Sequence, residues 1–368
     1  MKRRKFLAEA GVATGAALSP AIVHAQSKDL HWKLQSSNPA GTPNIELLKS
    51  FAADIQKMSA GRLNIEILPA GAIVGPFETL DAVNKGVVEV GQWWSDYAFG
   101  KNPAAGLFGA PLGGSGSGLD QMGQLAWYMY GGGRALYVEL YQKVLKSDVM
   151  PFLYECDGPE ALGWFKKPIT SVNELVKLRY RISSGLATDT IRQMGGVPVN
   201  MPGQELIPAA QKGIVDAIEW INPANDLKVG LYDVFKFYSL QGLHQAIGIA
   251  DVFFNGAKWR ALPPELQAMV ETAVNASLMR SLLFYIQANS ESIKELTGKH
   301  GVTIFPAPAD YAPAFIKAAK EVLKRFEDKD AFFAKILNSQ RGFAQLVVPY
   351  TRETAKLSTL ISGAADIK

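Results

Sequence analysis

An internal repeat constrains the fold of this chain more than any other feature of its sequence. Residues 78–93 align without a gap on residues 205–220, and each copy has the pattern of a helix, a Lys-Gly stop, an apolar strand and a polar residue followed by Trp. Open α/β sheets bind ligands at the carboxyl ends of their strands, where both polar-plus-Trp pairs would lie. The repeat therefore predicts two α/β lobes facing each other across a cleft, the preferred place for a small-molecule site. A chance match of a common helix–Gly–strand pattern is the alternative.

The segments outside the repeat also indicate the α/β class. Residues 30–35 have the pattern of a strand, Thr42 and Pro43 begin a helix that Gly61 ends, and residues 62–68 alternate with period two. Strand, helix and strand in this order predict parallel pairing. The C-terminal region is instead predicted to be helical, with patterns over residues 264–290, 311–327, 331–337 and 343–357.

Charge composition argues against a nucleic-acid-binding protein. The 368 residues carry 38 Lys and Arg against 34 Asp and Glu, a formal net charge of +4. Four of those basic residues and one of the acidic residues lie within residues 1–25, which leaves 34 positive and 33 negative groups beyond them. A chain so close to neutral has no positive excess with which to bind a phosphate backbone. No nucleic-acid partner is expected.

The first 25 residues are typical of an export signal. They combine a basic start, an apolar stretch rich in Gly and Ala, and small residues before position 26 that resemble a cleavage site. The adjacent Arg3 and Arg4 indicate the twin-arginine route. A membrane anchor is the alternative, but this run is short and broken by Gly, and no later segment has the roughly 20 apolar residues of a spanning helix. The sequence predicts a mature protein that is soluble in a bacterial periplasm.

The sequence lacks the motifs of common enzymes and metal sites. His31, His244 and His300 lie far apart with no Glu or Cys at ligand spacing, so no zinc site is predicted. A G-x-S-x-G elbow, a Walker loop and an H-E-x-x-H helix are all absent. The single Cys156 is interpreted as a core residue. Carboxylate and Tyr side chains can suffice for catalysis, so these residues alone do not exclude an enzymatic function.

Arg181 is the first candidate for ligand binding. It lies near the end of a predicted strand over residues 177–183, and Gly185 and a new helix follow. An Arg at this place can hold a carboxylate with two parallel hydrogen bonds, and the helix N-terminus adds N–H donors. Arg179 shares the same strand face and competes for this role. A surface cation is the alternative interpretation of Arg181.

Glu219 and Trp220 form the second candidate segment. A carboxylate that follows the apolar strand over residues 214–218 would be partly desolvated, so it would need a cation or hydrogen-bond donors. Trp220 could supply an apolar wall. A buried Glu paired with an internal Arg is the alternative interpretation.

These residues also carry a family resemblance. The exported leader, the turn at residues 66–71, the two Lys-Gly stops, the Tyr-Arg-Ile strand around Arg181 and the Glu219-Trp220 pair together resemble the solute-binding subunit of a tripartite ATP-independent periplasmic (TRAP) transporter of the DctP family. The chain is most similar to the branch that binds 2-oxo acids, lactate and related monocarboxylates with a metal cation. The resemblance implies a two-lobed, type II-like α/β periplasmic binding protein with a helical C-terminal region. Such a protein is not an enzyme and delivers an organic acid to the membrane subunits of a permease.

The resemblance also assigns the site residues. The carboxylate-binding Arg of the family falls on Arg181, and the cation ligands of the branch fall on Glu160, Glu219, Gln245 and the main chain at Trp220. Of these, all except Glu219 are also implied to contact the substrate. A relative of this branch has Gln where this chain has Glu160 and Glu where it has Gln245, so the exchange keeps two carboxylates. Oxygen ligands of this kind suit Na⁺ or Ca²⁺, and the choice between these ions stays open.

Lobe boundaries follow from the family architecture as well. The first lobe is expected to contain residues 26–151 and 239–262, and the second to contain residues 152–238 and 263–368. The chain would therefore pass between the two lobes more than once, and two or more such crossings form a hinge. The long C-terminal helices could also mediate a homodimer.

Aromatic contacts to the substrate are expected from the first lobe. They fall on Trp94 and Tyr97, with Trp93 as the alternative in a shifted register. Two other functions stay open at this point. One is an ABC-type receptor for organic acids, and the other is a periplasmic lyase or hydrolase that uses Glu160 and Glu219 as an acid–base pair.

Overall fold

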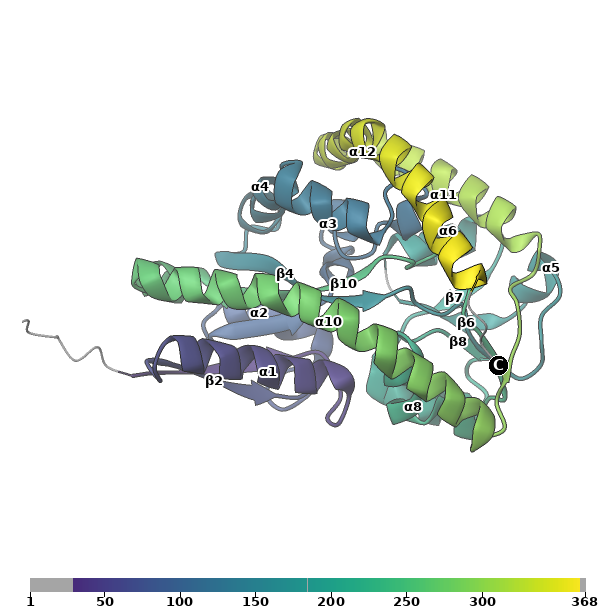
Figure 1. The fold of residues 1–368 in the computed structure, drawn as a ribbon, viewed down its shortest axis with the longest axis horizontal. Helices are drawn as coiled ribbons and strands as arrows, with labels where there is room; N and C mark the ends of the chain where they lie inside the picture. The colour runs from purple at the N-terminus through teal and green to yellow at the C-terminus, as the bar shows by residue number, and fades with distance from the viewer. Residues whose placement is uncertain (1–28, 184, 365–368) are drawn as a thin grey trace, which may run out of the picture.

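The computed structural model describes residues 29–183 and 185–364. The predicted export signal at residues 1–25 lies outside these ranges. Figure 1 shows two groups of strands side by side along the long axis, with helices around them. This is the two-lobed α/β architecture that the sequence predicts.

The first sheet has five strands in the order β2-β1-β3-β10-β4. β1 pairs in parallel with β2 and β3, whereas β10 runs antiparallel to both β3 and β4. The late strand β10 lies between two earlier ones, so the chain returns to this sheet after building the second sheet. The strands are β1 (Leu30–Ser36), β2 (Leu63–Leu68), β3 (Val90–Trp93), β4 (Val149–Gly158) and β10 (Gly248–Asn255).

The second sheet has six strands in the order β11-β9-β5-β8-β6-β7. The strands are β5 (Gly163–Phe165), β6 (Arg179–Arg181), β7 (Val197–Val199), β8 (Ala217–Ile218), β9 (Phe237–Ser239) and β11 (Thr303–Ile304). β6 runs parallel to β7 and β8, and β5 runs antiparallel to β8 and β9. Because Arg181 pairs with Ile218 across β6 and β8, the next residue, Glu219, lies beside Arg181.

Helices cover both sheets. They are α1 (Pro43–Met58), α2 (Thr79–Asn84), α3 (Gln121–Tyr130), α4 (Gly133–Glu139), α5 (Val172–Leu175), α6 (Leu186–Gln193), α7 (Leu206–Gln211), α8 (Pro223–Val229), α9 (Gly256–Ala261), α10 (Pro264–Gly298), α11 (Tyr311–Glu327) and α12 (Ala331–Gly363). Short 3₁₀ or π turns lie at Pro76–Glu78, Ser95–Ala98, Pro103–Leu107, Leu112–Gly114, Leu140–Val144, Gly203–Glu205 and Leu231–Asp233. α10 runs along the molecule and packs on α1, β4 and α8 (Figure 1). Within residues 29–183 and 185–364, no helix is both long enough and apolar enough to cross a membrane.

The first strand, helix and strand form as the sequence predicts. Thr42 has extended backbone angles, and Pro43 fills the first helical position, where a missing N–H breaks no helical hydrogen bond. The buried face of α1 carries Leu48, Phe51 and Ile55, which belong to the same core as residues of β1 and β2. The apolar periodicity of the sequence therefore corresponds to the face of α1 that packs inward.

Both copies of the repeat adopt the same local structure. α2 is followed by Gly86 with a φ of 73°, and α7 is followed by Gly213 with a φ of 66°. In each copy the residue after the Gly donates its N–H, at 2.9 Å, to the carbonyl five positions earlier. Gly allows this helix end because it adopts a left-handed backbone conformation without a steric penalty. Each copy then supplies an interior strand, β3 in the first sheet and β8 in the second.

The two Trp residues of the repeat do not occupy equivalent places. Trp93 is buried in the core, where its Nε1 donates to Tyr141 Oη at 2.9 Å and its ring packs against Phe253. Successive side chains of a strand point to opposite faces, so Trp94 rather than Trp93 reaches the ligand side. Trp93 is therefore the last residue of β3, at the carboxyl end of the strand as predicted, but its side chain packs into the core and not toward the ligand side.

The C-terminal helices also differ from the prediction. The sequence predicts separate helices over residues 331–337 and 343–357, whereas the structure has a single helix, α12. Between the two predicted segments, the buried Gln340 donates from Nε2 to the Leu107 carbonyl at 2.7 Å. Tertiary contacts of this kind override a weak local helix propensity, and the helix continues through the expected break.

Asp251 on β10 is a fully buried carboxylate. The Tyr141 hydroxyl donates to its Oδ2, and Trp93 donates to that hydroxyl in turn. Burial raises the pKa of Asp251 to about 7. Because an unfolded Asp titrates near pH 4, the folded protein keeps this proton between about pH 4 and pH 7. The stabilisation that the bound proton provides is present below that window and is lost as the pH rises through it.

We expect Asp251→Asn, which cannot ionise, to gain stability relative to the wild type as the pH rises from about 4 to about 7. The difference in unfolding free energy should shift toward the variant by about 1.4 kcal/mol per pH unit at most. Urea unfolding of both proteins at several pH values in this window measures the shift. A difference that stays constant with pH would contradict a protonated Asp251 in the folded state.

Candidate functional site

A narrow cavity of about 10 Å³ lies between the two sheets. Its lining residues are Trp94, Asp96 and Tyr97 from the segment after β3, together with Glu160, Arg181, Ser183, Trp220, Ile221 and Gln245. A larger hollow of about 470 Å³ lies along α1, β1 and β2, but its charged lining residues, such as Lys33 and Lys49, are exposed to solvent. Buried polar groups converge in the smaller cavity, so it is the stronger candidate for a binding site.

Arg181 reaches this cavity from the end of β6, with 3% of its side chain exposed. Nη1 donates to the backbone carbonyl of Glu219 at 2.6 Å and to Glu219 Oε2 at 3.0 Å. Nε and Nη2 donate to the Met201 carbonyl at 3.2 and 3.1 Å. These bonds use four of the five guanidinium N–H groups and leave one on Nη2 for a ligand. The Trp220 ring stacks on the guanidinium, with 5.1 Å between Cζ and the ring centroid.

Arg179, the competing candidate, lies at the surface. Its Nε and Nη2 form a two-pronged pair with Asp216 at 2.8 and 2.7 Å, and 48% of its side chain is exposed. Arg179 does not line the cavity. Of these two basic residues, Arg181 is therefore the one positioned to contact a molecule held there.

Glu160 and Glu219 are both buried beside Arg181. Glu219 Oε2 accepts hydrogen bonds from Arg181 and from the Ser183 N–H, the latter at 2.8 Å. Glu160 Oε2 and Glu219 Oε1 have no hydrogen-bond partner among the described residues. Burial, together with the charge of Glu219, raises the pKa of Glu160 well above its usual range. Ionising both groups in this space is costly unless a cation lies between them.

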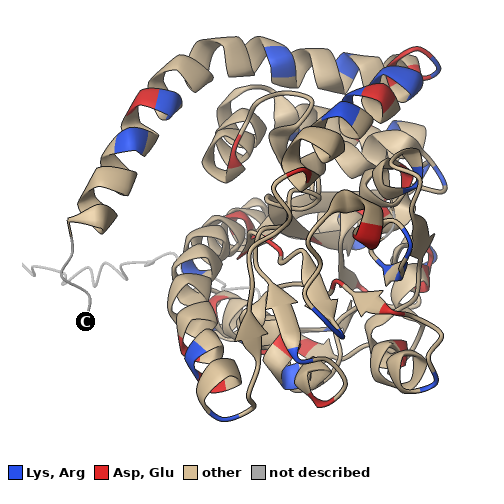
Figure 2. Ribbon diagram, turned by 90° about the vertical axis from the view of Figure 1, so that its right-hand side faces the viewer, with Lys and Arg blue, Asp and Glu red and all other residues tan. Residues whose placement is uncertain are grey.

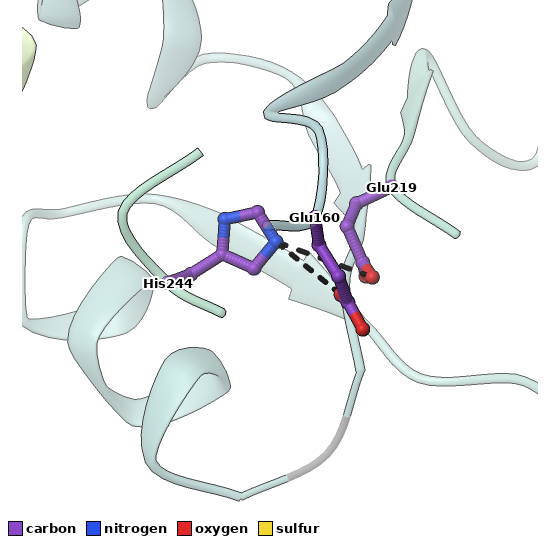
Figure 3. A group of neighbouring side chains, drawn as sticks. All are labelled: Glu160, Glu219 and His244. Carbon is purple, nitrogen blue, oxygen red and sulfur yellow. Dashed lines mark ion pairs between the residues drawn. The ribbon is translucent and has the colours of Figure 1, made fainter. Parts of the chain in front are cut away.

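His244 joins this cluster, although the sequence spacing does not reveal it. Its Nε2 lies 3.9 Å from Glu160 Oε2 and 4.0 Å from Glu219 Oε1 (Figure 3). Burial lowers the pKa of the imidazole. The sequence spacing, from which no zinc site is predicted, cannot reveal this cluster, because the three side chains come from separate segments that only the fold brings together.

Gln245, from the segment between β9 and β10, and Trp220, which follows β8, also line the cavity. Gln245 Oε1 accepts from Ser183 Oγ at 2.8 Å, and the Gln245 carbonyl accepts from the Glu160 N–H at 3.0 Å. The Trp220 ring packs so closely on Gly203 that a Cβ there would lie 2.4 Å from it. The residues that the family resemblance assigns to this side therefore converge on one cavity.

Trp94 and Tyr97 form the opposite wall. Their ring centroids lie 6.0 Å apart, and Trp94 Nε1 donates to Asp157 Oδ2 at 3.1 Å. Asp96, between them in sequence, also lines the cavity, although no pattern in the sequence singles it out. Burial and the charges of Asp251 and Glu219 raise the pKa of Asp96 to about 8. Asp96 is therefore largely neutral near pH 7 and adds little negative charge to the site.

This arrangement fits a cation bound next to an anion. Carboxylate oxygens from Glu160 and Glu219 and the amide oxygen of Gln245 are donors that Na⁺ and Ca²⁺ take. The unpartnered oxygens of the two Glu side chains are those that would bind the ion. Arg181 contacts the other oxygen of Glu219, so a ligand carboxylate could contact the Arg and the cation together.

Comparison with known proteins identifies the family. The model of "bacterial extracellular solute-binding protein, family 7" (DctP) matches residues 34–330 of this chain. The chain belongs to the DctP family. It is a TRAP-type solute-binding protein, as the sequence resemblance indicates. Membership of the DctP family supports the prediction of a transport receptor. It does not support the two alternatives that the residues alone leave open, an ABC-type receptor and an acid–base enzyme.

Three relatives of this DctP protein have a known ligand or ligand class. A monocarboxylate 2-oxoacid-binding periplasmic protein of Nostoc sp. is 30% identical over 360 residues, which cover 96% of each chain. A TRAP solute-binding protein of Bordetella bronchiseptica, a dimer with copurified calcium and picolinate, has a TM-score of 0.85 at 27% identity, covering 92% of this chain and 98% of its own. A third relative, a TRAP solute-binding protein of Pseudoalteromonas atlantica with bound sodium and pyruvate, has a TM-score of 0.82 at 28% identity. The match covers 90% of this chain and 99% of the relative.

Proposed function

We propose that this DctP protein captures a small 2-oxo or 2-hydroxy monocarboxylate together with a cation in the bacterial periplasm. It then delivers the acid to the membrane permease subunits of a TRAP transporter. The observation that carries this proposal is the buried cluster of Arg181, Glu160 and Glu219, in which a fixed positive charge lies beside two carboxylates that need a counter-ion.

The class of ligand follows from the charges in the cavity. A ligand carboxylate beside Glu160 and Glu219 brings three negative groups together, and Arg181 can neutralise one of them. A cation held by the two Glu side chains and Gln245 offsets the remaining repulsion. An acid with an oxygen on the carbon next to its carboxylate chelates that cation. Picolinate and pyruvate, named for the two relatives of known structure, each carry a second donor atom next to the carboxylate.

The contacts of Arg181 support coupling between the cation and the acid. Nη1 of Arg181 is occupied by Glu219 in this structure. A cation that balances the charge of Glu219 weakens that bond and frees the guanidinium for two parallel hydrogen bonds to the ligand carboxylate. Cation and acid should therefore each raise the affinity for the other.

A thermal-shift screen tests this function. Pyruvate, lactate and longer 2-oxo acids should stabilise the protein, by about 2.7 kcal/mol at a concentration 100 times Kd. Propionate, which has the carbon skeleton of pyruvate without the second oxygen, is the matched control and should have little effect. Equal stabilisation by propionate, or no stabilisation by any acid, would contradict the proposal.

The ligand reaches this cavity when the two lobes separate, because most of the lining side chains are buried. We assign residues 26–151 and 239–262 to the first lobe and residues 152–238 and 263–368 to the second, except that residues 152–158 belong to β4 and therefore stay with the first sheet. Asp157 supports a hinge near the first boundary, because its side chain accepts from Trp94 and its carbonyl accepts from Asn222 at 2.9 Å. Contacts of α12 with α3 and α4 make that helix a further link between the lobes.

Export is proposed to use the twin-arginine route. Replacing both Arg3 and Arg4 with Lys should trap the precursor in the cytoplasm, because this route reads the Arg pair itself. Fractionation of cells that express the wild type or the variant measures the effect. An unchanged periplasmic yield would instead assign export to the general secretory route.

We infer that α12 mediates a homodimer. Its C-terminal part extends away from the body of the molecule (Figure 2), and Leu346, Tyr350 and Leu357 are between 57% and 74% exposed. Their spacing places them on one helix face, on which Glu353 lies between Tyr350 and Leu357, and exposed apolar side chains gathered in this way are typical of an interaction site. An apolar groove between α3 and α10, lined by Met129 and Met279 among others, offers a complementary surface on a second copy.

Replacing Leu346 and Leu357 with Ser is expected to convert the dimer into a monomer. Size-exclusion chromatography with light scattering gives the mass of the wild type, of this variant and of a control. Met58→Ser is the control, since Met58 is an exposed apolar residue at the end of α1. A monomeric wild type, or a variant that keeps the dimer mass, would rule out α12 as the interface.

A further inference from the structure

Two buried carboxyl groups lie near the end of β4, outside the proposed cation cluster. Glu155 and Asp157 are both fully inaccessible to solvent. Asn44 Nδ2 donates to Glu155 Oε1 at 2.7 Å and to Asp157 Oδ1 at 3.1 Å, so one amide group faces both side chains. All four carboxyl oxygens accept hydrogen bonds, and their donors are amide, hydroxyl and indole groups. Because these donors already use the oxygens, the pair is unsuited to a second cation, and a different role explains it.

The indole of Trp94 is one of these donors. Its Nε1, the single polar atom of the ring, donates to Asp157 Oδ2 at 3.1 Å. The ring lines the ligand cavity and packs against Tyr97, with 6.0 Å between the ring centroids. A buried indole N–H is costly without a partner, so the ring keeps the orientation in which this bond forms. Asp157 therefore fixes how Trp94 meets a bound ligand, although Asp157 does not line the cavity itself.

The main chain of Asp157 contacts the segment that forms the opposite wall. Its carbonyl accepts from Asn222 Nδ2 at 2.9 Å. Asn222 is fully buried and caps α8, where its Oδ1 accepts from the Asn225 N–H at 3.1 Å. It directly follows Trp220 and Ile221, which line the cavity. One residue thus links the two walls, the first through its side chain and the second through its carbonyl.

Helices α1 and α10 hold the carboxyl pair in place. Asn44 lies in the first turn of α1, and Tyr285 of α10 donates to Glu155 Oε1 at 2.9 Å. Asn225 of α8 in turn donates to the Tyr285 hydroxyl at 3.2 Å. A side chain that positions another one needs fixed neighbours of its own. These bonds supply them, so the carboxyl pair is a rigid acceptor for the indole.

We propose that Asp157 is a positioning residue for the ligand: its carboxyl group holds the Trp94 ring against the bound acid, and its carbonyl ties that wall of the cavity to the opposite wall through Asn222. The inference rests on the proposed function, because it concerns the acid bound in the same cavity. Mutations at one binding site change koff more than kon. Loss of the bond between Asp157 and Trp94 should therefore show mainly as faster release of the acid.

Stopped-flow fluorescence tests this role with pyruvate as the probe, in the presence of a cation that supports binding. Trp220 lines the cavity and supplies a signal in every variant. Asp157→Leu removes the acceptor at similar side-chain size and should raise koff about tenfold, with kon changed less than about threefold. Asp157→Asn keeps an oxygen acceptor, and its koff should stay within about threefold of the wild-type value. Burial and the charge of Glu155 raise the pKa of Asp157 well above its usual range, so the neutral Asn is close to the state of this side chain near pH 7.

A double-mutant cycle separates positioning from a general loss of stability. Trp94→Phe removes the donor and should also raise koff. Adding Asp157→Leu to Trp94→Phe should then change koff by less than about twofold, because the bond is already absent. Tyr285→Phe is the matched control, since it removes a hydrogen bond from the same carboxyl pair but leaves the Trp94 indole bonded. It should lower the stability in urea and leave koff within about twofold of the wild-type value.

Hydrogen exchange in the wild type adds a readout that needs no change at Asp157. The indole N–H signal of Trp94, identified by its absence in Trp94→Phe, should exchange at least about tenfold more slowly with pyruvate than without it. Exchange that pyruvate does not slow would overturn the inference. A koff effect of Asp157→Leu that persists in full beside Trp94→Phe, or that Tyr285→Phe reproduces, would overturn it as well.

The outcomes also separate the two proposals. A wild type that binds pyruvate and releases it as fast as Asp157→Leu does keeps the proposed function and removes the inference. A wild type that binds neither pyruvate nor another 2-oxo or 2-hydroxy acid contradicts the function, and the role of Asp157 falls with it.

Discussion

Replacing Arg181 with Ala is expected to weaken pyruvate binding by about 2–5 kcal/mol, or roughly 30- to 5,000-fold, the range for truncating one partner of a buried charge pair. The cost is large because the Arg181 side chain is 3% exposed and bonded to the Glu219 side chain, so its loss leaves both Glu219 and the ligand carboxylate without their fixed counter-charge. Calorimetry of the folded variant, with cation present, measures the change.

Arg179→Ala is the matched control for this experiment. Arg179 lies two residues earlier on the same strand, but it pairs with Asp216 at the surface and should change the affinity less than about twofold. Arg181→Lys should give an intermediate loss, because Lys keeps the charge but not the fork of N–H donors. Wild-type affinity in Arg181→Ala together with lost binding in Arg179→Ala would move the carboxylate site to Arg179.

Exchanging the polar groups at positions 160 and 245 should produce the second large effect. Glu160→Gln removes one of the two carboxylates from the cation site and is expected to lower cation affinity by about 100-fold or more. Adding Gln245→Glu in the same chain returns the second carboxylate to the cavity, and it recreates the pattern that the family resemblance implies for a relative. Most of the lost affinity should therefore return in the double variant.

The stability of the cation-free protein supplies the control. Glu160→Gln should raise this stability although it lowers the affinity for the cation. Burial and Glu219 raise the pKa of Glu160, so Glu160→Gln should make the cation-free protein more stable above the usual pH range of a Glu carboxyl. Urea unfolding and metal titrations of the wild type and both variants give the two quantities. A double variant that binds cations no better than Glu160→Gln would show that the two positions do not share one site.

The sequence predicts those parts of the fold that depend on local pattern. The strand, helix and strand from residue 30 to residue 68 follow apolar periodicity and helix-capping residues, which act within a few positions of the chain. The repeat is visible because its two Lys-Gly helix ends need the same left-handed backbone conformation. Features fixed by local chemistry can therefore be recognised without the structure.

The remaining features depend on contacts between distant segments. His244 is separated from Glu160 by 84 positions, so no spacing rule could place it within 4.0 Å of an acidic oxygen. Trp93 and Trp94 are both plausible ligand contacts in the sequence, and the pairing of β3 with its neighbours decides which of them faces the cavity. The expected break near Gln340 disappears because that side chain bonds to Leu107 on another element.

Candidate site residues could be named from the sequence because the family resemblance supplied them. From the residues alone, Arg179 and Arg181 compete equally, and burial separates them only once the fold is formed. Asp96 cannot be recognised in the sequence for a similar reason, since an acid next to a Trp carries no functional signal until the chain folds it into the cavity.

Pyruvate binding by metal-stripped protein tests the central claim most directly. Calorimetric titrations are run without added metal ion and then with Na⁺ or Ca²⁺ restored one at a time, each at constant ionic strength. The coupled site of Arg181, Glu160 and Glu219 predicts that at least one ion raises pyruvate affinity by about tenfold or more, which is a coupling free energy of about 1.4 kcal/mol. One ion should be bound per chain. Equal pyruvate affinity in all conditions, with no bound metal by elemental analysis, would contradict it.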